Sequence, residues 1–127
     1  MTFTFKQLSD LADAYRGLRE QKLPFKLSLI IAKDLPVLEK EIEFYVEQER
    51  EFANTYLEKN EDGTFVQTEP NMFKIKEDLL AECQEARAAL DGFTAEINLH
   101  KVPVNLIENL EFTPAQLESM AEVIEEE

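Results

Sequence analysis

Two runs of mostly apolar residues at heptad spacing constrain the fold of this chain more than any other feature. The first run alternates in steps of four and three and has one polar member: Leu38, Ile42, Tyr45, Glu49, Phe52 and Tyr56. The second run follows the same steps: Leu79, Cys83, Ala86, Leu90, Phe93 and Ile97. Helices with such seams pack along each other, and each would be about 30 Å long at about 1.5 Å per residue. We therefore predict a mainly α fold built on a long antiparallel helical hairpin over residues 24–97.

The first arm of this hairpin should begin at Pro24, because proline suits the first turn of a helix, and should extend to about Lys59. Pro36 lies inside this arm. A proline removes one backbone donor and clashes with the carbonyl four residues earlier, so we expect a kink or break near residues 32–35. Glu49 is expected to fix the register of the hairpin or its oligomeric state, and Arg87 is its candidate partner.

The connector between the arms, residues 60–76, has the composition of a short β-hairpin. Gly63 ends a turn signal, and the stretches Thr64–Thr68 and Met72–Lys76 resemble strands. Between them Glu69–Asn71 suits a tight turn. We predict a β-hairpin at the tip of the helical hairpin. Since a two-stranded hairpin alone is marginal in water, it must pack on something else.

Capped helices are expected at both ends of the chain. Each start has a threonine followed three residues later by glutamine, the pattern of a capping box: Thr4 with Gln7, and Thr113 with Gln116. The first box predicts a helix within residues 1–22. The second predicts a helix within residues 98–127, after an extended segment that contains Pro103.

Length and composition favour one domain in the cytoplasm. The chain has 127 residues and 44% apolar residues, which is enough for a single core, and we expect one domain over residues 1–127. No apolar stretch approaches the roughly 20 residues of a membrane span, so no membrane association is expected. The N-terminus lacks a basic region followed by an apolar one, so no signal peptide is expected. Cys83 is the single cysteine and cannot form an internal disulfide.

The net charge of −14 limits the kinds of partner. Phosphate contacts supply most non-specific affinity for nucleic acid, so direct binding to DNA or RNA is not expected. Five glutamates form a candidate acidic face on the predicted long helix: Glu39, Glu41, Glu43, Glu47 and Glu51. Such a face is most often a solvated surface, and its alternative role is contact with a partner.

No residue pattern indicates an active site, so we expect no enzyme activity, no cofactor and no metal. Cys83 belongs to an apolar seam and is interpreted as a small buried residue, and His100 as an ordinary surface residue. Glu82 and Glu85 have the spacing of one half of the metal site in helical nucleotide pyrophosphohydrolases, but the second half, a Glu-x-x-Asp pair on the next helix, does not follow. A metal-dependent hydrolase built on these two residues is the least favoured alternative.

The order of segments along the chain is similar to that of a known family. A capped N-terminal helix comes first, followed by Leu23–Leu27 and by a long acidic helix that ends in Tyr56–Gly63. A strand at Phe73–Lys76, another helix and the segment Ile107–Leu110 come after them. In this order the chain resembles small proteins of tailed phages and prophages of Gram-positive bacteria, a family known as a domain of unknown function. The resemblance covers most of the chain. It implies a viral origin and supplies no activity and no functional residues.

The leading hypothesis is a non-enzymatic, phage-encoded interaction or assembly protein whose partner is a protein, a second copy of the chain included. Four apolar residues of the predicted β-tip are the candidate contacts: Phe65, Val66, Phe73 and Ile75. The alternative hypothesis is an acidic inhibitor that imitates nucleic acid and blocks a host defence protein or another nucleic-acid-binding protein through the acidic face.

Overall fold

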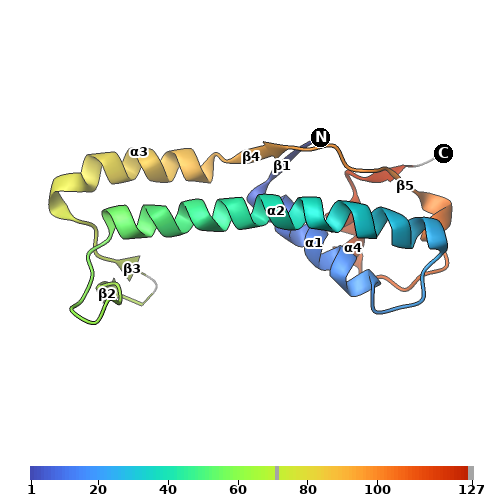
Figure 1. Ribbon diagram of the computed structural model, residues 1–127, viewed down its shortest axis with the longest axis horizontal. Helices are drawn as coiled ribbons and strands as arrows, with labels where there is room; N and C mark the ends of the chain where they lie inside the picture. The colour runs from blue at the N-terminus through green and yellow to red at the C-terminus, as the bar shows by residue number, and fades with distance from the viewer. Residues whose placement is uncertain (71, 126–127) are drawn as a thin grey trace. The chain divides into compact units, whose positions relative to one another are not determined.

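The structure is a computed structural model that describes residues 1–70 and 72–125 (Figure 1). These residues are mainly helical, with short strand pairs. They form two compact units: a terminal unit of Met1–Glu43 and Thr94–Glu127, and a middle unit of Phe44–Phe93. The boundary between the units falls inside one long helix. The single domain expected from the length of the chain stays a prediction.

The terminal unit begins with strand β1 (Thr2–Thr4), which leads directly into helix α1 (Phe5–Leu18). Thr4 caps this helix, since its Oγ1 accepts a hydrogen bond from the backbone N–H of Gln7. In return Gln7 Oε1 accepts one from the N–H of Thr4. The box satisfies two donors that a helix start leaves unpaired, which explains why α1 begins here. One face of α1 is buried: Leu8, Leu11, Ala12, Ala14, Tyr15 and Leu18.

Helix α2 (Phe25–Tyr56) continues through Pro36, so a break near residues 32–35 is wrong, whereas the alternative expectation of a kink stays a prediction. Buried positions lie on both sides of the proline along one face of the helix: Leu27, Ile31, Asp34, Leu35 and Leu38. We attribute the continuity to this packing, which holds the helix together although one backbone donor is missing. The helix ends at Tyr56, three residues before the expected Lys59.

Strand β4 (Thr94–Glu96) replaces the last turn of the predicted helix over residues 79–97. It pairs antiparallel with β1, with Thr2 opposite Glu96 and Phe3 opposite Ala95. Phe3 and Ala95 are buried and the residues beside them are exposed, which is the alternation of a half-buried strand. The apolar side chains of Phe93 and Ile97 had fitted the heptad spacing. Their backbone nevertheless leaves the helix, because residues 94–96 pair with β1, a segment about 90 residues away.

The C-terminal part of the terminal unit contains a parallel strand pair and a short helix. Strand β5 (Val102–Pro103) pairs with β6 (Ile124–Glu125), and the 3-10 turn η2 (Val104–Leu106) follows β5. Helix α4 (Pro114–Met120) is capped by Thr113, whose Oγ1 accepts from the N–H of Gln116. Helix α4 packs against α1.

The middle unit contains the end of α2, the 3-10 turn η1 (Glu77–Leu79) and helix α3 (Leu80–Asp91). Helix α3 has 12 residues, so the second arm is shorter than the seam predicted. Tyr45 meets Phe93, with ring centroids 5.2 Å apart, while Glu49 meets Arg87. Tyr45 precedes Glu49 in the chain, whereas its partner Phe93 follows Arg87, so the two segments are antiparallel at these contacts.

Three chain segments form the tip of the middle unit. Strands β2 (Gln67–Glu69) and β3 (Met72–Phe73) are antiparallel, and Asn71 of the predicted turn lies outside the described residues. The segment after α2 pairs with residues just outside these strands, through single bridges of Leu57 with Ile75 and of Lys59 with Phe65. Both strands are shorter than the stretches expected at residues 64–68 and 72–76.

A closed set of three backbone hydrogen bonds holds this tip. The N–H of Glu58 donates to the carbonyl of Lys74, that of Lys74 to Val66, and that of Val66 back to Glu58. The predicted β-hairpin therefore pairs with a third backbone segment. This is consistent with the expectation that a two-stranded hairpin must pack on another part of the protein.

The two units differ in how deeply their side chains are buried. The largest fully buried side chains of the described residues all belong to the terminal unit: Tyr15, Phe3, Leu8, Leu11, Leu18, Leu27, Ile31, Leu35, Leu38, Met120, Val102 and Val123. In the described part of the middle unit, Cys83 is the one buried side chain. Short chain segments bury little surface, and the middle unit keeps most of its apolar side chains half-buried or exposed.

Candidate partner-binding groove of the middle unit

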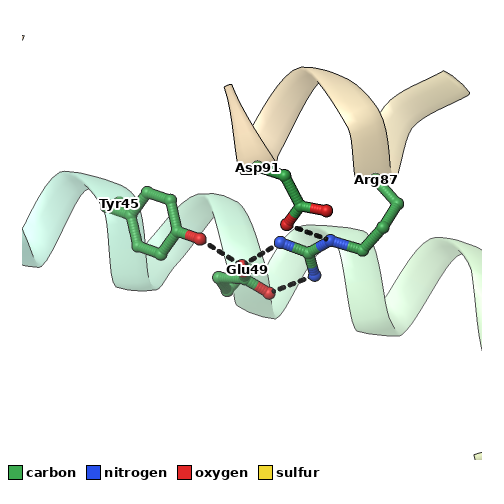
Figure 2. A network of polar contacts seen from close by, with 4 residues as sticks. All are labelled: Tyr45, Glu49, Arg87 and Asp91. Carbon is green, nitrogen blue, oxygen red and sulfur yellow. Dashed lines mark hydrogen bonds and ion pairs between the residues drawn. The ribbon is translucent and has the colours of Figure 1, made fainter. Parts of the chain in front are cut away.

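A network of four polar side chains connects α2 and α3 within the middle unit (Figure 2). The Arg87 guanidinium binds Glu49 with two parallel bonds, Nη1 to Oε2 at 2.9 Å and Nη2 to Oε1 at 2.5 Å. Its Nε donates to Asp91 Oδ1 at 3.0 Å, and the Tyr45 hydroxyl donates to Glu49 Oε1 at 2.6 Å. Such forked arginine–carboxylate pairs are among the stronger polar contacts in proteins.

The network favours the charged forms of Glu49 and Arg87. The hydrogen bonds from Arg87 lower the pKa of the Glu49 carboxyl below its usual value, although partial burial opposes the shift. The same bonds raise the pKa of Arg87. The pKa of Tyr45 is raised as well, first because its hydroxyl proton is donated to Glu49. The sequence had indicated Glu49 and Arg87 as candidate partners, and the structure brings them together.

An aromatic side chain completes the surroundings of Arg87. The Phe52 ring lies with its centroid 5.0 Å from the guanidinium carbon, within the range of a cation–π contact. Phe52 in turn packs against Tyr56, with ring centroids 5.2 Å apart. Arg87 is therefore held by two carboxylates and one ring, and its side chain keeps 36% of its exposure.

Beside this network lies an open groove with a volume of about 600 Å³. Its walls come from α2, α3, β3 and the segments next to them: Glu49, Phe52, Ala53, Leu57, Phe73, Ile75, Cys83, Gln84, Arg87, Ala88 and Asp91. The volume is in the range of protein pockets that bind ligands, and most of the lining is apolar with a few polar groups. All of these residues belong to the middle unit.

The four predicted contact residues occupy different places around this groove. Phe73 and Ile75 line it, and Phe73 is 42% exposed. Phe65 packs edge-on against Phe73, with ring centroids 6.1 Å apart, and Lys59 Nζ lies 5.6 Å from the Phe65 centroid. Val66 is part of the backbone hydrogen bonds of the tip and does not line the groove. Sequence reasoning missed the contributions of Phe52, Leu57 and Cys83, which come from three other segments.

The five glutamates of the candidate acidic face are divided between the units. Glu39 and Glu43 are exposed in the terminal unit, and Glu41 is half-buried there. Glu47 and Glu51 are exposed in the middle unit. Two of these carboxylates have basic partners: Glu39 lies 3.5 Å from Arg16, and Glu47 lies 3.1 Å from Arg50. The face is therefore partly neutralised by the protein itself.

Three of the residues considered for chemistry belong to α3, and His100 belongs to the terminal unit. Glu82 and Glu85 are exposed on α3, and Cys83 is buried against the groove. The described residues contain no group of three or more His, Cys, Asp or Glu side chains placed to hold a metal ion. Within residues 1–70 and 72–125 no helix has both the length and the apolar character needed to cross a membrane.

His100 has a role that the sequence did not indicate, because it binds the buried carboxylate of Asp34. The backbone N–H of His100 donates to Asp34 Oδ2 at 2.7 Å, and its Nδ1 lies 2.6 Å from Oδ1. Asp34 is 2% exposed, while half of the His100 side chain faces solvent. Burial, and then the charge of Asp34, raise the pKa of Tyr15 in the same core. This contact is structural, since it satisfies a buried charge.

Comparison of the chain with known protein families, with curated proteins and with solved structures finds no match.

Proposed function

We propose that this chain is a non-enzymatic interaction protein that binds another protein through the groove of the middle unit. The observation that carries the proposal is the apolar wall of the groove, with Phe73 exposed at its edge. Five of the large exposed apolar side chains belong to the middle unit: Phe44, Val46, Met72, Phe73 and Leu80. Exposed apolar surface in a unit with little buried core is typical of a surface that a partner covers.

The arrangement supports this function physically. In this proposal the end of α2 and α3 act as an antiparallel helical hairpin with the β-tip at its end. The Glu49–Arg87 pair fixes the register of the two helices, and the ring of hydrogen bonds in the tip positions Phe73 and Ile75. A groove on paired helices can receive apolar side chains of a partner with little rearrangement.

The origin and the place of action that we propose follow the family resemblance. A phage-encoded protein of this kind would act in the cytoplasm of the host cell, either on a host or phage protein or in an assembly with its own copies. Fold and charge alone do not assign an activity, so the proposal rests on the groove.

Affinity capture with two matched variants tests the proposal. Phe73→Ser removes the aromatic side chain at the groove, whereas Phe25→Ser removes one that is 79% exposed in the terminal unit. We expect the wild type and Phe25→Ser to retain the same partner from host or infected cells, and Phe73→Ser to lose it. Light scattering of the purified proteins shows whether a second copy is that partner. A partner retained equally by both variants would refute the role of the groove.

A second candidate is the acidic inhibitor, which the exposure of Glu43 and Glu51 favours. An inhibitor of this kind would act through many charge contacts, so capture should weaken steeply as the salt concentration increases. A partner bound mainly through the apolar groove should be retained at high salt. Replacing Glu43 and Glu51 together by glutamine should release the partner only if the acidic face binds it.

A further inference from the structure

The groove of the middle unit has a mostly apolar wall, and the charged side chains in and around it are mainly negative. Phe52, Leu57 and Ile75 supply apolar wall, and the charged side chains among the lining residues are Glu49, Arg87 and Asp91. Arg87 is bound by both carboxylates, so its charge is more than compensated inside the groove. The Asp91 side chain is 67% exposed and presents a carboxylate at the edge.

The middle unit as a whole also carries more negative than positive side chains. Residues 44–93 contain twelve Asp and Glu side chains against five Lys and Arg, which is a net charge of −7 in a chain of net charge −14. An approaching molecule therefore meets a negative potential before it reaches the apolar wall. Complementary charge accelerates encounter and selects among partners that are equally apolar.

The same charges disfavour two other occupants. A second copy of this chain would bring another fourteen net negative charges towards the first, and like charges placed opposite each other across an interface repel. An acidic segment of another protein meets the same repulsion. An apolar segment that carries lysine or arginine on its outer face fits both properties of the groove.

Resting on the function proposed above, we propose that the groove binds a positively charged, amphipathic segment of another protein. Its apolar side chains enter between α2, α3 and β3, against Phe52, Phe73 and Ile75. Its basic side chains remain at the edge, where they meet Asp91 and the carboxylates of the surrounding surface. An amphipathic helix in a groove is one recurring form of such recognition, in which residues three and four apart supply the apolar anchors.

Two synthetic helical peptides of about 18 residues, or five turns, separate apolar from charged recognition. Both carry the same leucine face, and the outer face is lysine in one and glutamate in the other. A third peptide has the composition of the leucine–lysine peptide in scrambled order, so it keeps the charge and loses the apolar face. Each is labelled and titrated with the full-length protein, and binding is measured by fluorescence anisotropy.

Two adjacent alanines of α3 provide variants of equal charge. Ala88 lines the groove, whereas Ala89 lines a different hollow, and both are exposed on the helix. Ala88→Lys places a bulky positive side chain in the groove, and Ala89→Lys adds the same charge outside it. Helix propensity changes equally in both, so circular dichroism and urea unfolding should show equal stability.

We expect the leucine–lysine peptide to bind at least about tenfold more tightly than the other two peptides. Ala88→Lys should weaken this binding about tenfold, and Ala89→Lys should weaken it less than about threefold. Equal weakening by both variants would mean diffuse charge attraction and would overturn the proposal. Equal groove-dependent binding of the lysine and glutamate peptides would overturn the charge selection and leave the proposed function standing. A dimer of the free protein that Ala88→Lys dissociates would make a second copy the occupant, which also overturns it.

Discussion

The Glu49–Arg87 pair allows a quantitative test of how the middle unit is held together. The perturbation is a double-mutant cycle of Glu49→Gln, Arg87→Gln and the variant with both changes. Glutamine at position 49 keeps an oxygen that can accept the Tyr45 hydroxyl, so the charge is the main loss. The loss of the Arg87 contact with Phe52 occurs in both arms of the cycle and cancels.

The geometry sets the expected magnitude. The side chains of Glu49 and Arg87 keep 32% and 36% of their exposure, which places the pair between a buried and a surface ion pair. Exposed pairs contribute about 0.2–1 kcal/mol, and solvent screening keeps this pair near that range. Its forked geometry favours the upper end, and we expect a coupling energy of about 1 kcal/mol. Glu47 and Arg50 form a more exposed single contact at 3.1 Å, and their cycle should give about 0.3 kcal/mol or less.

The assay is urea unfolding of the full-length protein at several pH values. Because the pKa of Glu49 is lowered in the folded state, the stability from this pair is fully present above the unfolded pKa of about 4.3. It is lost as the pH falls through the lower folded pKa. The coupling energy should therefore be equal at about pH 7 and pH 5.5 and should decrease as the pH falls below about 4.3. A coupling no larger than that of Glu47 and Arg50, or one that persists in acid, would refute the reasoning.

Two further substitutions test the terminal unit by urea unfolding. Asp34→Ala leaves the His100 donors without their buried acceptor and should cost about 2–3 kcal/mol, whereas Asp34→Asn keeps one acceptor oxygen and should cost less. Equal losses would mean that the hydrogen bonds contribute little. Pro36→Ala restores a backbone donor inside a continuous helix and should stabilise the protein by about 1–3 kcal/mol. A loss of stability in Pro36→Ala would show that the proline is required by its surroundings.

Features encoded within a few residues were predictable from the sequence. The helix starts at Thr4 and Thr113 depend on a threonine and a glutamine three residues apart, and both capping boxes are present. The tip segment also has local signals, and its two strands lie within the expected residues 60–76. The contact of Glu49 with Arg87 could also be expected. Glu49 occupies a heptad position of the first run and Arg87 follows one of the second run. The two residues lie at matching distances from the connector.

Features that depend on distant segments were not predictable in this way. The heptad spacing continues to Ile97, but pairing with β1 holds residues 94–96 as a strand. Pro36 has a strong local signal for a break, which the packing of Leu35 and Leu38 overrides. Asp34 was a usable signal for the buried polar contact, since it is a charged residue on an otherwise apolar face, but nothing near it in sequence indicates His100. The groove likewise needs four segments that only the folded chain brings together.

The backbone pairings of the two units have a consequence for the order of folding. The hydrogen-bonded ring of the tip joins Glu58 to Lys74, whereas the β1–β4 pair joins Thr2 to Glu96 and closes most of the chain into one loop. The entropy lost on closing a loop increases with the logarithm of its length. Closing the loop from Thr2 to Glu96 therefore costs about 1.5 kcal/mol more free energy than closing the loop from Glu58 to Lys74. We therefore expect the tip to form early and the N-terminal strand to dock late in folding. In pulsed deuterium exchange during refolding, the amide of Val66 should be protected before that of Ile97, which pairs with Met1.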